Sequence, residues 1–325
     1  MLVLLAAVVT GAVAQTTYKV SVKEGTDDAT SWQGKAGTGD YQELPLEGVA
    51  AGTAVTVKYS GTKKVKSVKA KKKAAGNTVD LSTLTANYEA QDGDVLTGST
   101  SAFCVTIAAG ATVTLDGVNI SGGSYCIKCL GDATIILKDG STNTLTGTGD
   151  QYPALWAGDA NTTLTIQGST GVLNVTSGEY CAGIGGGYAN TNSTCGNIRI
   201  EGGVITAQGG SYGSGIGTVA GPATCGNIII TGGTITAKGG SDAAGIGTGS
   251  GISQQVVCGD ITIANTVTKV TATKGANAPY SIGKGYGSNT TCGTITIGGT
   301  KYWENNAAVG DGATYLAQDQ IVYQP

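Results

Sequence analysis

A short repeat fills the C-terminal two-thirds of the chain, and it limits the possible folds more than any other feature. Its clearest copies begin at Cys195, Cys225, Cys258 and Cys292, and the first two read CGNIRIEGGVITAQGG and CGNIIITGGTITAKGG. One such unit has too little apolar surface to form a core alone, whereas stacked copies share a continuous core. The repeat therefore predicts a solenoid.

Each unit contains three short segments typical of β-strands. Apolar and polar residues alternate in these segments, β-branched residues are frequent, and glycine pairs separate them. Strands stacked about 4.8 Å apart would align equivalent residues in columns. The pattern predicts an all-β fold, a right-handed parallel β-helix that forms a single-stranded solenoid of about seven coils.

The repeat also predicts which aliphatic residues form the core columns. In the first strand, 113–115, 135–137 and 164–166 align with Ile198/Ile200, Ile228/Ile230, Ile261/Ile263 and Ile295/Ile297. The second column contains Leu145, Leu173, Ile205, Ile235 and Val270, and the third contains Val105, Ile127, Leu155, Ile184, Ile216, Ile246 and Ile282.

The rest of the chain divides into regions with other patterns. Residues 1–14 (MLVLLAAVVTGAVA) are apolar, too short to span a bilayer and end in a small-x-small motif, which predicts a signal peptide. We expect a small β-sandwich-like module at 15–73, a linker at 74–86, the β-helix at 87–300 and a C-terminal cap at 301–325. No later stretch is long enough for a transmembrane segment, so the sequence predicts a secreted or cell-surface protein.

Composition excludes several kinds of function. The chain has no histidine, which removes Ser-His-Asp triads and histidine-metal sites. Its single arginine, Arg199, and its acidic C-terminal body argue against nucleic acid as a partner. A lysine run at residues 63–73 predicts either a solvated edge strand or attraction to an anionic polymer or membrane surface.

The cysteines follow the repeat. Cys195, Cys225, Cys258 and Cys292 occupy one repeat position, and Cys104 and Cys126 share another, so each set predicts a ladder. Two arrangements remain open: buried free thiols, which we favour because cysteine packs as a small apolar residue, and disulfides between adjacent rungs. Cys126 and Cys129 have the spacing of a redox or zinc motif, but no histidine or second pair accompanies them.

Carboxylates give little sign of catalysis. Polysaccharide lyases and hydrolases need clustered acids, whereas the acids here are spread over different strands and corners of the repeat. We therefore expect no catalytic residue, no metal site and no cofactor. A polysaccharide lyase or hydrolase remains the third hypothesis.

Tyrosine is the most informative residue type, with 14 copies against one phenylalanine. Several aromatic residues flank the third strand of the repeat, and stacking would bring them to one edge of the solenoid at steps of about 5 Å or multiples of it. Such rings offer apolar faces and hydroxyl groups to sugars, or they cover the glycine-rich corners. The predicted ligand-binding residues are Tyr125, Tyr152, Trp156, Tyr180, Tyr188, Tyr212, Tyr280 and Tyr286.

The run DGDVLTGSTSAFCVTIAAGATVTLDGVNI, the CGNI and AGIG units, and VTKVTATKGANAPYSIG resemble the Gly-rich repeat proteins that anaerobic gut bacteria export. These are carbohydrate-binding-domain proteins, similar to a family with a polysaccharide-lyase-like right-handed β-helix and no known lyase activity. The resemblance covers residues 16–325 and implies a polysaccharide or glycan partner, with calcium in some members. An adhesive or structural surface solenoid without a glycan site is the alternative, and the sequence leaves the oligomeric state open.

Overall fold

The structure is a computed structural model that describes residues 76–122, 124–187 and 193–325 in full, together with the backbone of seven strands among residues 1–75. The chain divides into two compact units, Met1–Ala75 and Gly76–Pro325. Each unit is described by itself.

The N-terminal unit contains two antiparallel sheets. One has the order β1(Leu2–Leu5), β6(Ala54–Tyr59), β3(Trp32–Ala36), β4(Gln42–Glu43), and the other the order β5(Leu46–Ala50), β2(Thr17–Val22), β7(Val68–Lys72). Strand β7, which includes three of the clustered lysines, is an end strand of its sheet. Strand β1 pairs with β6, whereas residues 6–14 of the predicted signal peptide lie outside the described residues.

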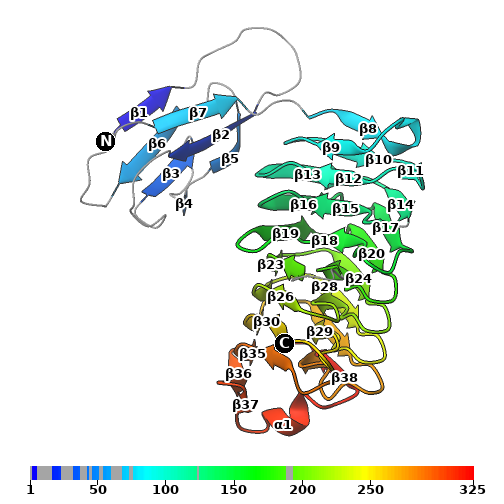
Figure 1. Cartoon of the computed structure of the whole chain (residues 1–325). Coiled ribbons are helices and arrows are strands. Elements are labelled where there is room, and N and C mark those ends of the chain that lie inside the picture. Colours follow the sequence, from blue (N-terminus) through cyan, green and yellow to red (C-terminus); the bar gives the residue numbers. More distant parts are fainter. Residues whose placement is uncertain are drawn as a thin grey trace. The chain divides into compact units, whose positions relative to one another are not determined.

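The unit Gly76–Pro325 is a parallel β-helix, as predicted, and Figure 1 shows its strands stacked coil upon coil. Its strands form four sheets, which we number by the order of their strands within a complete repeat. The first sheet contains β8(Thr78–Asp80), β10(Val95–Thr97), β13(Ala111–Leu115), β16(Ala133–Leu137), β19(Thr163–Gly168), β23(Asn197–Ile200), β27(Ile228–Ile230), β31(Ile261–Ile263), β35(Ile295–Ile297), β36(Thr300–Glu304) and β37(Ala307–Ala308). The second contains β11(Ser99–Thr100), β14(Asn119–Gly122), β17(Thr142–Gly147), β20(Val172–Thr176), β24(Val204–Gln208), β28(Thr234–Lys238), β32(Lys269–Thr273) and β38(Gln320–Tyr323).

The third and fourth sheets complete the coil. The third contains β9(Tyr88–Ala90), β12(Val105–Ile107), β15(Ile127–Cys129), β18(Leu155–Trp156), β21(Ile184–Gly185), β25(Ile216–Gly217), β29(Ile246–Gly247) and β33(Ile282–Gly283). The fourth contains β22(Ser193–Cys195), β26(Ala223–Cys225), β30(Val256–Cys258) and β34(Thr290–Cys292). Three strands per coil were predicted, so this additional strand of the later coils was missed.

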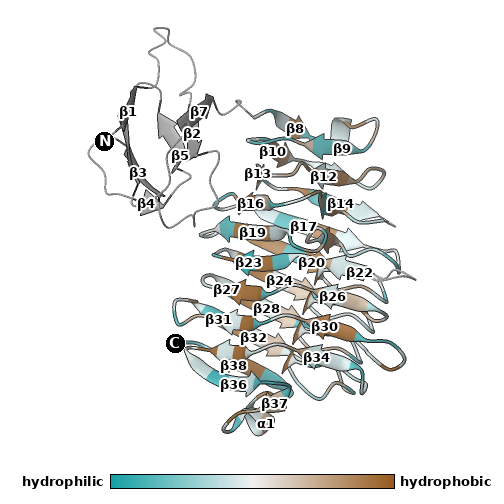
Figure 2. Cartoon of the chain, turned by 60° about the vertical axis from the view of Figure 1, so that its left-hand side comes forward, coloured by the Kyte–Doolittle hydropathy of each residue, from teal (hydrophilic) through white to brown (hydrophobic). Residues whose placement is uncertain are grey.

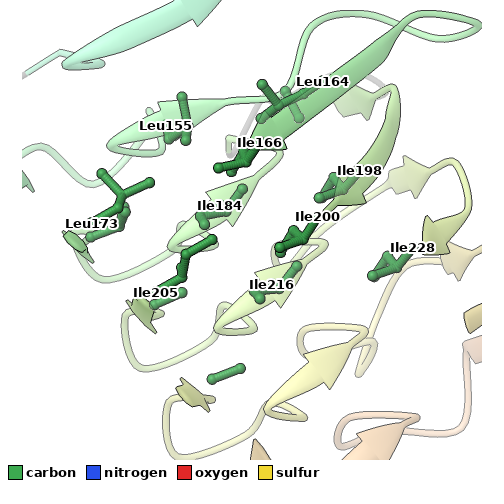
Figure 3. Packing of buried hydrophobic residues seen from close by; sticks show 14 of the residues in the cluster. Leu155, Leu164, Ile166, Leu173, Ile184, Ile198, Ile200, Ile205, Ile216 and Ile228 are labelled. Carbon is green, nitrogen blue, oxygen red and sulfur yellow. The ribbon is translucent and has the colours of Figure 1, made fainter. Parts of the chain in front are cut away.

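The core is built from columns of aliphatic side chains, and Figure 3 shows them converging from three walls of the coil. Ile198, Ile228, Ile261 and Ile295 are successive register partners in the first sheet, as predicted. The predicted third column, from Val105 to Ile282, is likewise confirmed. Burial of each such side chain contributes about 1.5–3 kcal/mol, so the column is the main stabilising element.

One predicted alignment in the first sheet is wrong by two residues. Ile135 lies opposite Ile166, and Leu137 lies opposite Gly168, whereas the repeat aligned 135–137 with Leu164–Ile166. Side chains in a strand alternate between faces, so a shift of two residues keeps the same set inward. The apolar pattern therefore could not detect the shift.

The second sheet contains the same error. Leu145 lies opposite Val175, and the partner of Leu173 is Asn143. A fully buried polar residue thus occupies a position that the repeat assigned to an aliphatic one.

The later coils enclose a small second core outside the third sheet. There the fourth strand and its loop cover the outward side of the third strand, and Ala182, Val219, Ala223 and Val256 pack together. The residue after the core isoleucine of the third strand is glycine in these coils, at Gly185, Gly217, Gly247 and Gly283. Strand β30, which contains Val256, is coloured brown, hydrophobic, in Figure 2.

The β-helix begins earlier than predicted. Strand β8 pairs with β10, and Leu81, in the 3-10 helix η2(Leu81–Thr83), is buried. Residues 76–86 therefore belong to the coil stack, so the predicted linker at 74–86 and the start at residue 87 are wrong. Strands β8 and β10 precede the seven first strands that the repeat predicted, so the first sheet has nine parallel strands in the described part of the chain.

The C-terminal segment covers the last coil. Strand β36 runs antiparallel to β35, and β38 runs antiparallel to β32. Between them, α1(Gly312–Tyr315) leads into Leu316, which is fully buried. Trp303 is also buried, whereas most of β36 is teal, hydrophilic, in Figure 2. No described helix is long and apolar enough to cross a membrane.

Candidate functional site

Tyr180 and Tyr212 form a stacked pair on successive coils. Their ring centroids are 5.0 Å apart, and the ring planes differ by 10°. Each tyrosine belongs to the loop that leads into the third strand, and the adjoining Ile184 and Ile216 are register partners. The spacing follows from the distance between coils, about 4.8 Å. Both rings are partly exposed, so the pair adds an aromatic surface to the edge of the β-helix.

This aromatic ladder ends after two coils. In the next coil the equivalent position, before Ile246, is Asp242, whose carboxylate accepts a hydrogen bond from Asn277 Nδ2 at 2.7 Å. Asp242 is 7% exposed, so it lies largely behind the surface. The stacking of tyrosines is therefore not continued in the coil that contains Asp242.

A second aromatic group lies in the two coils that directly precede the coil of Tyr180. Tyr125, Tyr152 and Trp156 contact one another with ring centroids 6.0–6.3 Å apart. Lys128 Nζ lies 4.0 Å from the centroid of Trp156, because Lys128 and Trp156 are register partners on β15 and β18. Tyr152 is 37% exposed. A lysine thus covers one face of the indole ring by a cation–π contact.

The other predicted site residues are separate from both groups. Tyr280 packs against Trp303 of the C-terminal segment, with centroids 5.5 Å apart. Tyr286 is exposed, and its backbone N–H donates to Asp242 O. Tyr188 lies outside the described residues. The structure therefore brings together five of the predicted aromatic residues, in a group of three and a pair.

A hollow of about 490 Å³ adjoins the tyrosine pair. It crosses three successive coils at the ends of β24, β28 and β32, and much of its lining is glycine backbone. Ser211, in its first coil, directly precedes Tyr212. The non-glycine residues that line it are Gln208, Ser211, Lys238, Ser241, Lys274 and Ala276. This hollow was not predicted from the sequence. The segments QGGS, KGGS and KGAN, which occupy one repeat position, are a signal that could have identified it.

The two lysines of the hollow differ in their surroundings. Lys238 is exposed and forms no ion pair with the described residues. The side chain of Lys274 is 15% exposed, and its Nζ donates to Ala278 O at 3.0 Å and lies 3.4 Å from Asp319 Oδ1. Asp319 is 99% exposed, so water strongly screens that ion pair.

Several acids of the solenoid hold the coils together. Asp132, Asp139 and Asp260 each accept a backbone N–H from the following coil, from Thr163, Thr170 and Thr294 respectively. Hydrogen bonds from Thr170 and Ser169 lower the pKa of Asp139, and the one from the backbone N–H of Thr170 has the largest effect. Within the described residues, no group of three or more acidic, cysteine or histidine side chains could hold a metal ion. These carboxylates therefore serve as structural acceptors.

The cysteine ladder is confirmed, but the expectation of free thiols is wrong for one rung pair. Cys195 and Cys225 are disulfide-bonded with their Cα atoms 4.6 Å apart, whereas Cys258 and Cys292 are free although they are also register partners. A hydrogen bond with Cys258, together with burial, raises the pKa of Cys292. The column therefore contains one disulfide and one dithiol pair.

The cysteines of the C-x-x-C segment are buried within the coil. Burial raises the pKa of Cys126 and that of Cys129 to about 12. Because the thiolate is the reactive and metal-binding form, neither side chain is suited to redox exchange or zinc binding at neutral pH.

Comparison with family models, curated proteins and solved structures found no match to this chain.

Proposed function

We propose that the protein is a non-catalytic polysaccharide-binding β-helix that acts outside the cell. The observation that carries this proposal is the stacked pair of Tyr180 and Tyr212 beside the hollow. Sugars present C–H groups and hydroxyls together, and a tyrosine offers an apolar ring and a hydroxyl at little conformational cost. A linear glycan is favoured because the aromatic surface and the hollow follow each other along the stacking direction of the coils.

The roles of the carboxylates support binding rather than catalysis. Glycosidases need an acid and a base or nucleophile within about 5–10 Å of each other, and these groups must be free to exchange protons. In this β-helix, Asp132, Asp139 and Asp260 instead accept backbone hydrogen bonds from neighbouring coils. The resemblance implies calcium in some members, but no group of three or more acidic, cysteine or histidine side chains that could hold a metal ion occurs among the described residues.

A polysaccharide array with the full chain tests the proposal. We expect binding to at least one extended glycan and a loss of at least about tenfold in affinity for the double variant Tyr180→Ala/Tyr212→Ala, because aromatic contacts of this kind contribute about 1–2 kcal/mol. The variant Tyr180→Phe/Tyr212→Phe keeps the rings and should retain most of the affinity.

Val322→Ala is the matched control: Val322 is 51% exposed and lies on β38, so the substitution removes exposed apolar surface outside the tyrosine pair and outside the lining of the hollow. Thermal melting of each variant separates lost binding from lost folding. Absence of binding to every glycan, with self-association or adhesion to proteins instead, would refute the proposal and favour an adhesive solenoid. Release of unsaturated or reducing sugars would show an enzyme.

A further inference from the structure

The pair of Cys258 and Cys292 carries an inference that does not depend on glycan binding. Both thiols are free, and they follow the disulfide of Cys195 and Cys225 in one column of the fourth sheet. We propose that Cys258 and Cys292 are a thiol oxidation site, at which a small disulfide such as glutathione disulfide converts the dithiol into a second disulfide. This second disulfide joins the last two strands of the fourth sheet.

The backbone around the free pair repeats the geometry that already accommodates a disulfide. Each of the four cysteines is the last residue of its strand and is followed by a glycine. At the existing disulfide, Gly226 N–H donates to Cys195 O at 3.1 Å, and at the free pair Gly293 N–H donates to Cys258 O at 3.0 Å. The existing disulfide spans 4.6 Å between Cα atoms, which is within the usual range for disulfides. Because the register is the same, the free pair can close without movement of the backbone.

The column also determines which thiols combine. Cys258 is the register partner of both Cys225 and Cys292. Cys225 is already bonded to Cys195, so a bond from Cys258 to Cys225 would only exchange one disulfide for another and release Cys195 as a thiol. A bond between Cys258 and Cys292 instead leaves no thiol in the column. These two side chains are hydrogen-bonded in the dithiol form, so their sulfur atoms are already close together.

Cys292 is the thiol that an external oxidant reaches first. It is 7% exposed, against 1% for Cys258, and it belongs to β34, the end strand of the fourth sheet. The hydrogen bond with Cys258, together with burial, raises the pKa of Cys292, although the positive charge of Lys284 acts in the opposite direction. Because the thiolate is the attacking form, oxidation proceeds when this end strand opens and the thiol regains its ordinary pKa.

The reaction is balanced by the reduction of glutathione disulfide. The thiolate of Cys292 attacks one sulfur of the oxidant, and the first glutathione leaves as a thiolate and takes up a proton. Cys258 then loses its proton and attacks Sγ of Cys292, which breaks the bond to the second glutathione. Two electrons and two protons thus pass from the cysteine pair to the oxidant, which becomes two molecules of reduced glutathione.

Closure of the pair secures an end of the β-helix that no further strand covers. The first and second sheets continue into β36 and β38, whereas the fourth sheet ends at β34 in the described part of the chain. With both disulfides formed, its four strands are joined in two covalent pairs. Local opening of the last coil, which cleavage by a protease requires, then becomes less frequent.

Peptide mapping of the full chain tests the inference. The protein is incubated with glutathione disulfide at about pH 8.5, where an ordinary thiol is half ionised, and is then alkylated and digested without reduction. We expect a peptide pair linked through Cys258 and Cys292, about 2 Da lighter than the sum of its thiol forms, while the link of Cys195 to Cys225 remains. Thermolysin should cleave the last coil of the treated protein at least about tenfold more slowly than that of the untreated protein.

Cys258→Ala separates the two steps of the reaction. Without the second thiol, Cys292 should keep its glutathione adduct, and treatment should give no protection from thermolysin. Cys129→Ala is the matched control, because Cys129 is also buried but its register partner on β12 is Ile107, and this variant should form the link normally.

Thermal melting before treatment shows whether each variant is folded, and mapping of the wild type decides the inference even if Cys258→Ala does not fold. A link between Cys225 and Cys258, or the absence of the link between Cys258 and Cys292 after treatment, would overturn the inference. Equal cleavage of treated and untreated protein by thermolysin would also overturn it.

Discussion

Asn143 lies directly opposite Leu173 in a core column of the second sheet, and its side-chain amide forms four hydrogen bonds inside the β-helix. Its Oδ1 accepts the backbone N–H groups of Gly117 and Val118, and its Nδ2 donates to Ser141 Oγ and Val172 O. The amide therefore joins the loop before β14 to the next two coils.

Replacement of this amide by an aliphatic side chain should destabilise the protein although it extends the apolar column. Asn143→Leu would remove the acceptor of the buried Val118 N–H, which costs about 1–3 kcal/mol, and also that of the exposed Gly117 N–H. We expect a loss of about 2–4 kcal/mol in the free energy of unfolding, measured by urea denaturation. Leu145→Ala, in the same strand, gives the cost of a simple cavity for comparison. Unchanged stability of Asn143→Leu would contradict the role of the amide.

A methyl group at Gly217 should disrupt the stack of later coils. Gly217 has φ 134°, and a Cβ there would lie 2.1 Å from Gly247 O in the next coil. Gly110 is the matched control, because it has φ 78° but open space around the Cβ position. We expect Gly110→Ala to cost about 1 kcal/mol and Gly217→Ala at least about 3 kcal/mol, or to prevent folding. Similar melting temperatures for the two variants would contradict the close approach.

The disulfide between Cys195 and Cys225 should stabilise two adjacent coils. Its sequence separation is 30 residues, for which loop closure predicts a contribution of about 3–4 kcal/mol. Cys195→Ser/Cys225→Ser should lower the free energy of unfolding, measured by urea denaturation, by that amount. Cys258→Ser/Cys292→Ser should lower it less. Peptide mapping without reduction should find Cys195 linked to Cys225, and a different pairing of the cysteines would contradict this disulfide.

Stability should decline in alkali, in part through Tyr88. Burial and a hydrogen bond from its hydroxyl to Asp94 raise the pKa of Tyr88 to about 12 from its usual 10.0. The folded state thus binds this proton more tightly, so its contribution is complete below pH 10 and is lost as the pH rises toward 12. Tyr88→Phe should be less stable than the wild type at pH 7 by about 1–2 kcal/mol, and the difference should shrink by pH 12. A constant difference between pH 7 and pH 12 would count against this linkage.

The sequence was sufficient to predict the fold because columns of isoleucine require only a regular spacing of apolar residues. It was insufficient where a register shifted by two residues buries the same faces of the strands. Ile135 is therefore paired with Ile166 rather than Leu164, and Asn143 rather than Leu145 is paired with Leu173. It also missed the fourth strand, since segments such as Ala223–Cys225 are too short to show alternation.

The candidate site was only partly predictable. The position of each tyrosine relative to the third strand was sufficient to place Tyr180 above Tyr212. The hollow was not predicted, because glycine corners such as those that line it also occur wherever a coil merely turns. The contact of Tyr280 with Trp303 was not predicted, because Trp303 comes from a segment outside the repeat.

The reversed direction of β36 and β38 has a consequence for assembly. Filaments of solenoids grow when the last rung of one molecule templates the first rung of the next, with every strand continuing in the same sense. At the C-terminal end, the second sheet finishes in β38, which opposes that sense, and in the first sheet the direction reverses at β36 and again at β37. A second molecule cannot extend the second sheet in register past β38, so at this end the chain's own repeats, rather than head-to-tail polymerisation, determine the length of that sheet.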